Sequence, residues 1–297
     1  MLQALQLIFL SIVWGTTWVA IKYSLDGFPP FLGASLRFIV AMVVLVFYAQ
    51  IKGISLKVPS GTFRYIFICA LLLYLFDYGI IYWAEQYLYA GVTAIFFATF
   101  PIFTGLLSAF VFRTEPPRAN TLLGLLIAFV GIAIIFYDQF LLTNFSGLTL
   151  IASIGIIISA FSAALSILVV KKYLSKVEII PLTLHQMFWG TLSLIVVGLL
   201  RGEPLAYSMN AEAIIAVLYM GIIASALAFV MYYSLLQHMN PTALSLIIYV
   251  TPLVGIATGW LFLGEVITPQ IIIGSILILM GIAVSQYHDL RKVASKA

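Results

Sequence analysis

Long apolar runs separated by short polar segments make up almost the whole chain. Each run has roughly the 20 residues that an α-helix needs to cross the hydrocarbon core of a bilayer. The runs lack the alternation of apolar and polar residues that is typical of membrane β-barrel strands. We therefore predict an all-α membrane protein with ten transmembrane helices, at residues 4–24, 30–51, 64–83, 89–112, 119–137, 147–170, 179–200, 212–235, 241–263 and 268–287.

One stretch of this pattern occurs twice, about 150 residues apart. Each copy has an apolar run with a proline in its middle, a glutamate at its end, and a second apolar run with two glycines. Such a repeat in a membrane-like sequence predicts two homologous halves, residues 1–137 and 147–290, related by a pseudo-two-fold axis. The matched residues are Pro101 with Pro252, Glu115 with Glu265, Gly124 with Gly274 and Gly131 with Gly281.

Composition agrees with a lipid environment. The chain is 64% hydrophobic and 8% charged, whereas soluble domains carry roughly 25% charged residues. The sequence has one cysteine and lacks the motifs of P-loop ATPases, zinc proteases and serine hydrolases. We therefore expect no cofactor, no metal and no catalytic residues. The net charge of +4 does not indicate a nucleic-acid partner.

The distribution of basic residues predicts the topology. With ten spans both ends lie on one side, and 11 of the 14 lysines and arginines fall in segments on that side. The positive-inside rule then predicts that both termini are cytoplasmic, in a multi-pass protein of the inner (cytoplasmic) membrane. Because each half has five helices, the two halves are inverted relative to each other. The first run lacks a basic start and a cleavage site, so we interpret it as a helix and not as a signal peptide.

The segment WGTTWVAIKYSLDGFPPFLGASLRF, residues 14–38, resembles the opening of the EamA-type drug/metabolite transporter superfamily. A Trp-Gly pair, a lysine, a loop proline and an arginine occur there in the same order. The later pattern of proline, glutamate and two glycines matches in both halves. The resemblance implies a metabolite exporter in which the first, third, fourth, sixth, eighth and ninth helices surround a central cavity. It does not specify the substrate, because the family exports many different metabolites.

Three charged residues lie in the interior of predicted spans, away from the first residue of each: Lys22, Arg37 and Asp77. A charge at the centre of a membrane helix costs roughly 2.5–3.5 kcal/mol on insertion scales, so each needs a partner or a cavity. Arg37 and Asp77 have similar predicted depths. They could form a structural ion pair, one of them could bind the substrate, Asp77 could carry a coupling proton, or Asp77 could lie at a wetter boundary. Lys22 could extend to the interface or attract an anionic group.

Aromatic residues are the other candidates for a binding site. Their helical spacing is typical of packing or of an interfacial belt, but it also suits the wall of a cavity. An aromatic cavity with few charges favours an amphipathic or aromatic metabolite, including a zwitterionic amino acid, over a sugar phosphate. The candidate substrate-binding residues are Trp14, Trp18, Tyr78, Tyr82, Phe97, Tyr232 and Tyr249.

Pro101 and Pro252 are the two prolines predicted to lie in the middle of helices. Each removes a backbone hydrogen bond and leaves an earlier carbonyl, on Phe97 or Ile248, without its usual partner. The two prolines could therefore be hinges of gating helices or simple kinks. The paired glycines favour close helix packing, with ligand contact as the alternative.

Together with the resemblance, these patterns predict a secondary transporter that works by alternating access. The resemblance, and not the residues, implies export of amino acids or related amphipathic or aromatic compounds. A channel or lipid-translocating protein is the alternative, and a membrane-embedded enzyme is less favoured. The expected partners are a small-molecule substrate and the lipid bilayer, with no nucleic acid, and the expected state is a monomer or a homodimer.

Overall fold

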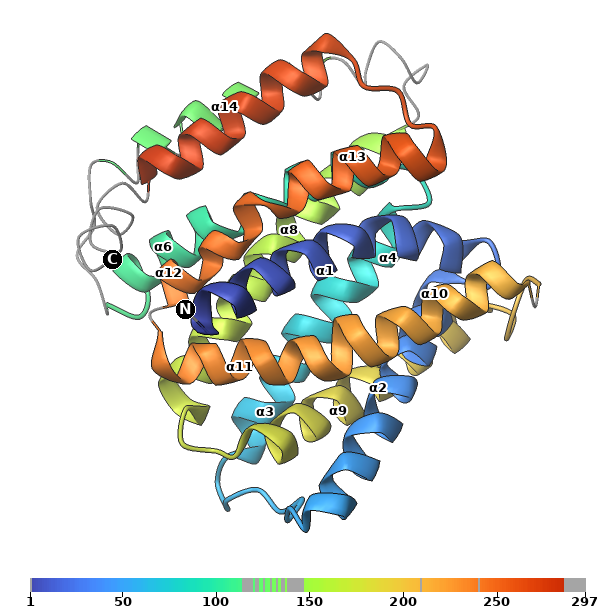
Figure 1. Cartoon of the computed structure of the whole chain (residues 1–297), viewed down its shortest axis with the longest axis vertical. Helices are drawn as coiled ribbons and strands as arrows, with labels where there is room; N and C mark the ends of the chain where they lie inside the picture. The colour runs from blue at the N-terminus through green and yellow to red at the C-terminus, as the bar shows by residue number, and fades with distance from the viewer. Residues whose placement is uncertain are drawn as a thin grey trace.

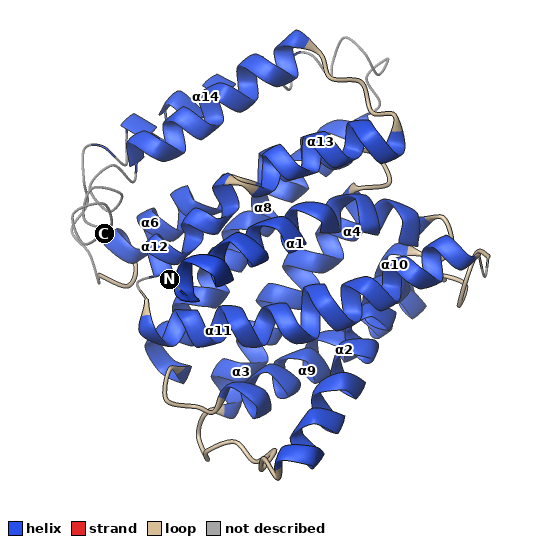
Figure 2. Cartoon of the chain, viewed as in Figure 1, coloured by secondary structure: helices blue, strands red, loops and turns tan. Residues whose placement is uncertain are grey.

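The computed structural model describes residues 2–113, 147–208, 210–239 and 241–285, together with individual positions between 120 and 137. Within this part of the chain every regular element is helical (Figure 2). Among the described residues, seven helices are long and apolar enough to cross a membrane, and two shorter apolar helices are Thr251–Leu263 and Pro269–Gly281. The all-helical membrane class is therefore confirmed. Glu115 and much of the predicted span 119–137 lie outside the described residues.

The first four predicted runs correspond closely to helices in the structure. The second run shows why: it begins with Pro30 in the first helical turn, where the missing N–H costs nothing, and it ends at Gly53 with a left-handed φ of 63°. The elements are α1 (Leu2–Leu25), α2 (Pro30–Lys52), α3 (Phe63–Ala70), the π-helix η1 (Leu71–Gly79), α4 (Ile80–Ala84), α5 (Ala90–Phe97) and α6 (Phe100–Phe110).

The second part of the chain is also helical, with π-helical and 3₁₀ segments inserted. Two apolar spans in it, Gly147–Leu174 and Ala211–His238, have 28 residues each and contain a π-helical segment. The elements are α8 (Gly147–Val169), the π-helix η2 (Val170–Leu174), α9 (Ile179–Leu200), α10 (Ala211–Gly221), the π-helix η3 (Ile222–Leu227), α11 (Ala228–His238), α12 (Pro241–Leu244), the 3₁₀ helix η4 (Ser245–Tyr249), α13 (Thr251–Leu263) and α14 (Pro269–Ser285).

The two matched prolines lie at helix starts and not in the middle of continuous helices. Pro101 is in the first turn of α6, and Pro252 is in the first turn of α13. The fourth predicted run is therefore broken between α5 and α6, and the ninth changes to a 3₁₀ helix before α13. In this way each proline avoids the helix interior, where its ring would clash with the preceding turn. The carbonyl of Ile248 accepts a hydrogen bond from the Thr251 hydroxyl at 3.1 Å.

The helices form a bundle in which α1 is central (Figure 1). It lies between α13 on one side and α10 and α11 on the other. Two other close pairs are α2 with α9 and α6 with α8. The glycines permit some of these approaches: a Cβ on Gly221 would lie 2.6 Å from Val40 Cβ and 2.9 Å from the Arg37 carbonyl oxygen. Small residues thus set how near α10 comes to α2.

Helix α14 lies at the edge of the bundle in Figure 1. It packs on described positions of the 119–137 run through the small residues that the repeat singled out. A Cβ on Gly131 would lie 2.5 Å from the Gly274 carbonyl oxygen, and one on Gly281 would overlap the Gly124 carbonyl oxygen. The packing interpretation of these glycines is therefore confirmed.

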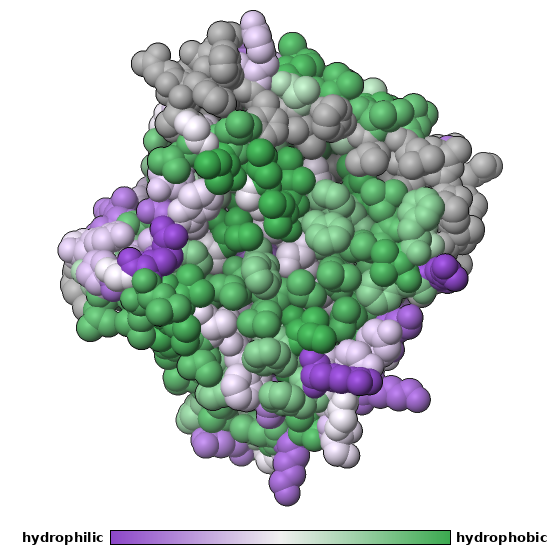
Figure 3. Space-filling model, turned by 180° about the vertical axis from the view of Figure 1, so that it is seen from behind, coloured by the Kyte–Doolittle hydropathy of each residue, from purple (hydrophilic) through white to green (hydrophobic). Residues whose placement is uncertain are grey.

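The outer surface is strongly apolar. Figure 3 shows hydrophobic side chains over the middle of one face and hydrophilic ones towards its margins. A contiguous apolar surface of this kind is suited to lipid and not to water. Exposed examples on α2, α8, α9 and α10 are Val43, Phe47, Ile151, Leu199 and Ile215.

Candidate functional site

A buried cavity of about 70 Å³ lies inside the bundle. Its wall contains residues of α1, η1, α4, α5, α6, α8, α11, α12, η4 and α13. These elements belong to the first, third, fourth, sixth, eighth and ninth predicted helices, which are the six that the resemblance implies. The cavity therefore lies where segments from both parts of the chain meet.

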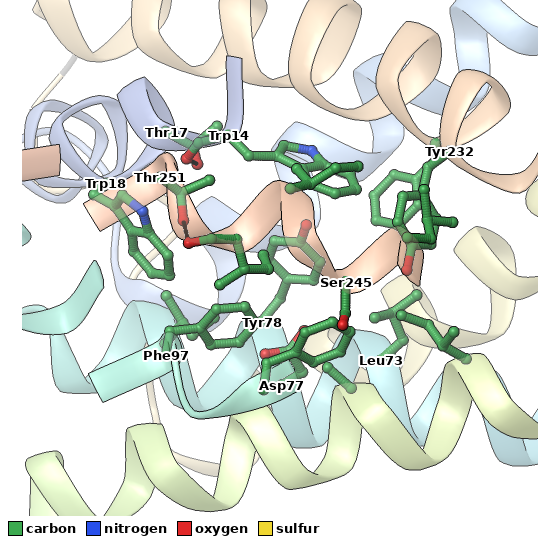
Figure 4. A pocket seen from close by; sticks show the side chains of 18 of the residues that line it. Trp14, Thr17, Trp18, Leu73, Asp77, Tyr78, Phe97, Tyr232, Ser245 and Thr251 are labelled. Carbon is green, nitrogen blue, oxygen red and sulfur yellow. Dashed lines mark hydrogen bonds between the residues drawn. The ribbon is translucent and has the colours of Figure 1, made fainter. Parts of the chain in front are cut away.

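Aromatic rings form much of the wall (Figure 4). The Trp14 ring lies 5.1 Å from that of Tyr232 and 6.2 Å from that of Phe229, and the Trp18 ring lies 5.4 Å from that of Phe97. All three pairs are tilted, which aromatic rings prefer to a face-to-face sandwich. These contacts join α1 to α11 and α5, so the rings both line the cavity and hold its sides together.

Asp77 is the charged residue among the described side chains of this wall. It is 2% exposed, and its carboxyl interacts with the Ser159 hydroxyl of α8. Its Oδ1, the Trp18 Nε1 and the Tyr232 hydroxyl have no hydrogen-bond partner in the part of the chain that the structure describes. Buried polar groups are nearly always paired. Three unpaired groups on one cavity therefore indicate a place for a polar ligand or for water.

Arg37 is fully buried but does not line the cavity. Its Nε donates to the Ser225 hydroxyl at 2.7 Å, and its Nη2 donates to the Ala224 carbonyl at 3.3 Å. Its guanidinium lies 4.7 Å from the centre of the Tyr78 ring. No ion pair joins it to Asp77, although both residues are described. Arg37 thus connects α2 to the π-helix η3, and the Ala224 carbonyl there also accepts a hydrogen bond from Trp14 Nε1 at 3.3 Å.

Lys22 also lies outside the cavity. Its ammonium donates to the backbone carbonyl of Glu85, at the end of α4. A cation at a helix C-terminus is favoured by the unpaired carbonyls and the helix dipole. The Glu85 side chain is fully buried, and burial raises the pKa of its carboxyl well above the usual value of 4.5, although the Lys22 ammonium acts in the opposite direction.

Glu265 connects the second half of the chain to the start of α5. Its carboxylate accepts hydrogen bonds from the backbone N–H groups of Gly91, at 3.0 Å, and Ala90. A carboxylate at a helix N-terminus satisfies N–H groups that lack partners within the helix. Burial raises the pKa of the Glu265 carboxyl, and these N–H groups and the Lys22 ammonium reduce that increase.

The structure brings together six of the residues selected from the sequence and leaves the others elsewhere. Trp14, Trp18, Asp77, Tyr78, Phe97 and Tyr232 line the cavity. Tyr82 is fully buried, and its hydroxyl donates to the Met220 sulfur at 3.4 Å. The Tyr249 side chain lies outside what the structure describes.

Sequence reasoning missed several wall residues. Phe229 could have been found, because it lies three residues before Tyr232 and therefore on the same helical face. Ser245 and Thr251 carry no such signal, since small hydroxyl residues are common in membrane helices.

Membrane transporters bind their substrates in cavities of this kind, between apolar helices. The model of the EamA-like transporter family matches residues 1–137 and 150–287, and the chain belongs to that family. The expected class is therefore confirmed. The family and its relatives are named transporters and not enzymes, in agreement with the sequence-based expectation.

Relatives of similar length match along almost the whole chain. The uncharacterized transporter YoaV of Bacillus subtilis (strain 168) is 25% identical over 97% of this chain and 98% of its own. A probable amino-acid metabolite efflux pump of Salmonella typhimurium is also 25% identical, over 93% and 92%. A solved crystal structure superposes with a TM-score of 0.71 over 96% of this chain and 97% of its own, and its identity of 18% indicates a shared fold alone.

Proposed function

We propose that this protein is a secondary transporter that exports amino acids or related amphipathic and aromatic compounds across the cytoplasmic membrane. The observation that carries this proposal is the buried, aromatic cavity with unpaired polar groups at the meeting point of six helical segments. The Salmonella relative, named a probable amino-acid metabolite efflux pump, supports the substrate class.

The proposed architecture is ten helices arranged as two inverted five-helix repeats, residues 1–137 and 147–290, acting as a monomer or homodimer with both termini in the cytoplasm. The helix contacts support it, because exchanging the halves converts several of these contacts into one another. The contact of α1 with α13 corresponds to that of α8 with α6, α1 with α10 to α8 with α3, and α2 with α10 to α9 with α3. The two separate matches of the family model agree with the same division.

Local irregularities support the repeats independently. The π-helix η3 begins at Ile222, which is 151 residues after Leu71, the first residue of η1. Lys22 and Lys171, which lie 149 residues apart, each donate to carbonyls at the end of the third helix of their own half. The acceptors are Glu85 for Lys22, and Leu236, Gln237 and Met239 for Lys171.

The proposed mechanism is alternating access. A cavity of about 70 Å³ has room for a few water molecules, since each needs at least about 10–15 Å³. A metabolite therefore requires the aromatic walls to separate. The breaks before Pro101 and Pro252 are where α6 and α13 can turn relative to α5 and α12, so that one side opens as the other closes.

The test is counterflow in proteoliposomes containing the purified full chain. The vesicles are loaded with unlabelled amino acids and aromatic metabolites, and uptake of the labelled compound is followed for wild type, Tyr78→Ala and Tyr65→Ala. Tyr78 lines the cavity, whereas Tyr65 stacks on Tyr173 at 4.3 Å outside it. We expect saturable exchange that is lost in Tyr78→Ala and kept in Tyr65→Ala. Absence of saturable exchange with every compound would contradict the proposal.

A further inference from the structure

The charged groups of the spans differ in whether they remain available to a ligand. The Lys22 ammonium is bonded to the carbonyl that ends α4. The Arg37 guanidinium is bonded to Ser225 and to Ala224, and it lies against the Tyr78 ring. Neither residue lines the cavity. The two cations that could have attracted an anionic substrate are therefore engaged in the helix framework.

Asp77 is in the opposite situation. It lines the cavity and is 2% exposed, and its Oδ1 has no hydrogen-bond partner among the described residues. Figure 4 places it on the cavity wall beside Tyr78 and across from Trp14. A buried carboxylate oxygen without a donor is costly, and a positively charged donor is the partner that compensates it best.

We propose that the cavity binds a protonated amine carried on an aromatic or apolar body, with Asp77 as its counter-charge. This inference rests on the proposed transport function and narrows its substrate class. The rings of Trp14 and Phe229, which line the same cavity, attract a cation through their π-faces and also accommodate the apolar body. The Trp18 N–H and the Tyr232 hydroxyl remain for neutral polar groups of the ligand.

A carboxylate on the ligand is disfavoured by the same wall. Among the described side chains that line the cavity, none is a lysine or an arginine. A bound carboxylate would therefore lose its hydration and lie near the like charge of Asp77, with neutral donors as its compensation. Amines that lack a carboxylate consequently bind more tightly than the corresponding zwitterionic amino acids.

Three compounds with the same indole ring test this order: tryptamine, tryptophan and indole-3-propionate, which are cationic, zwitterionic and anionic. Equilibrium binding to the purified full chain in detergent is measured by titration calorimetry. We expect tryptamine to bind most tightly and indole-3-propionate most weakly. In Asp77→Asn, which keeps the shape but removes the charge, tryptamine affinity falls about 10- to 100-fold, as expected for loss of a charge-assisted hydrogen bond.

Two further variants separate charge from folding. Asp26→Asn makes the same chemical change at an exposed position outside the cavity and leaves tryptamine affinity unchanged. Asp77→Glu keeps the charge and retains the preference for tryptamine over indole-3-propionate. If Asp77→Asn does not fold, the order of the three compounds on the wild type and on Asp77→Glu still decides the question.

Several results would overturn the inference: tighter binding of tryptophan or indole-3-propionate, equal affinities, no binding of tryptamine, or an unchanged tryptamine affinity in Asp77→Asn. The counterflow assay distinguishes this failure from that of the transport proposal. Saturable exchange of only those compounds that lack an amine would support the transport proposal and contradict the inference that the ligand is a protonated amine. Absence of exchange with every compound would remove the transport proposal itself.

Discussion

Replacing Arg37 by lysine tests whether its guanidinium is a structural connection between α2 and η3. The substitution keeps a positive charge at a fully buried position. It removes the planar group that donates hydrogen bonds to both Ser225 and Ala224 and lies 4.7 Å from the Tyr78 ring. A lysine ammonium is a point-like donor and cannot reproduce this geometry.

The expected cost follows from the contacts that are lost. An ammonium can retain one of the two hydrogen bonds, and losing the other costs about 1.5–3 kcal/mol because the donor is charged. Loss of the buried cation–π contact adds about 0.5–2 kcal/mol. The charge stays buried, so its desolvation cost is not relieved. The free energy of unfolding should therefore fall by about 2–5 kcal/mol.

Thermal unfolding in detergent, followed by tryptophan fluorescence, measures this effect. Arg64→Lys is the matched control, because Arg64 also combines a hydrogen bond with a ring contact: it donates to the Tyr65 hydroxyl at 2.7 Å and lies 4.6 Å from the Tyr65 ring, but at an exposed position. Arg64→Lys should change the free energy of unfolding by no more than about 0.5 kcal/mol. Equal, small shifts in the two variants would refute the structural role. So would a stable Arg37→Lys that no longer binds its substrate, since Arg37 would then act on the ligand.

Two further predictions concern packing and pH. Gly190→Ala should destabilise by about 1–3 kcal/mol, because its Cβ would overlap the Tyr74 side chain. Gly147→Ala, whose Cβ would meet no atom of the described residues within 4 Å, should have little effect; similar unfolding midpoints for the two variants would contradict this. Because the folded-state pKa of Glu85 is raised, the unfolding free energy should fall as the pH rises above 4.5, where the unfolded chain loses its proton first. In Glu85→Gln the unfolding free energy should fall less between pH 5 and pH 8 than in the wild type. Parallel curves of unfolding free energy against pH for wild type and Glu85→Gln would refute this role of Glu85.

The helices themselves could be predicted closely from the sequence. Run 179–200, for example, coincides with α9 (Ile179–Leu200). The long apolar stretches make this possible, because a membrane leaves the backbone few alternatives to a helix. The matched prolines predicted a kink or a hinge in two of these runs, but not that each run divides into separate helical segments, because hydropathy does not change there.

The candidate site was harder to predict, and Tyr78 and Tyr82 illustrate why. They are four residues apart and would share one face of a regular α-helix. The π-helix η1 ends at Gly79, between them, and its wider turn rotates the residues that follow. Tyr78 therefore lines the cavity while Tyr82 lies in the packed interior.

Arg37 and Asp77 show a second limit. Their similar depth suggested an ion pair, but depth alone does not give the direction of a side chain. The actual acceptors of Arg37 are a serine hydroxyl and a backbone carbonyl from the other half. Neither has a residue type or spacing that would have marked it as a partner.

The Ala224 carbonyl, which accepts hydrogen bonds from Trp14 and Arg37, has a consequence for which sequence changes this family member can tolerate. Since the acceptor is a backbone atom, a point substitution of Ala224 leaves it in place. An insertion or deletion of one residue just before it would instead turn it by roughly 100° about the helix axis. Both donors would then lose it together. Variation in this stretch should therefore accumulate as replacements, while its length stays fixed.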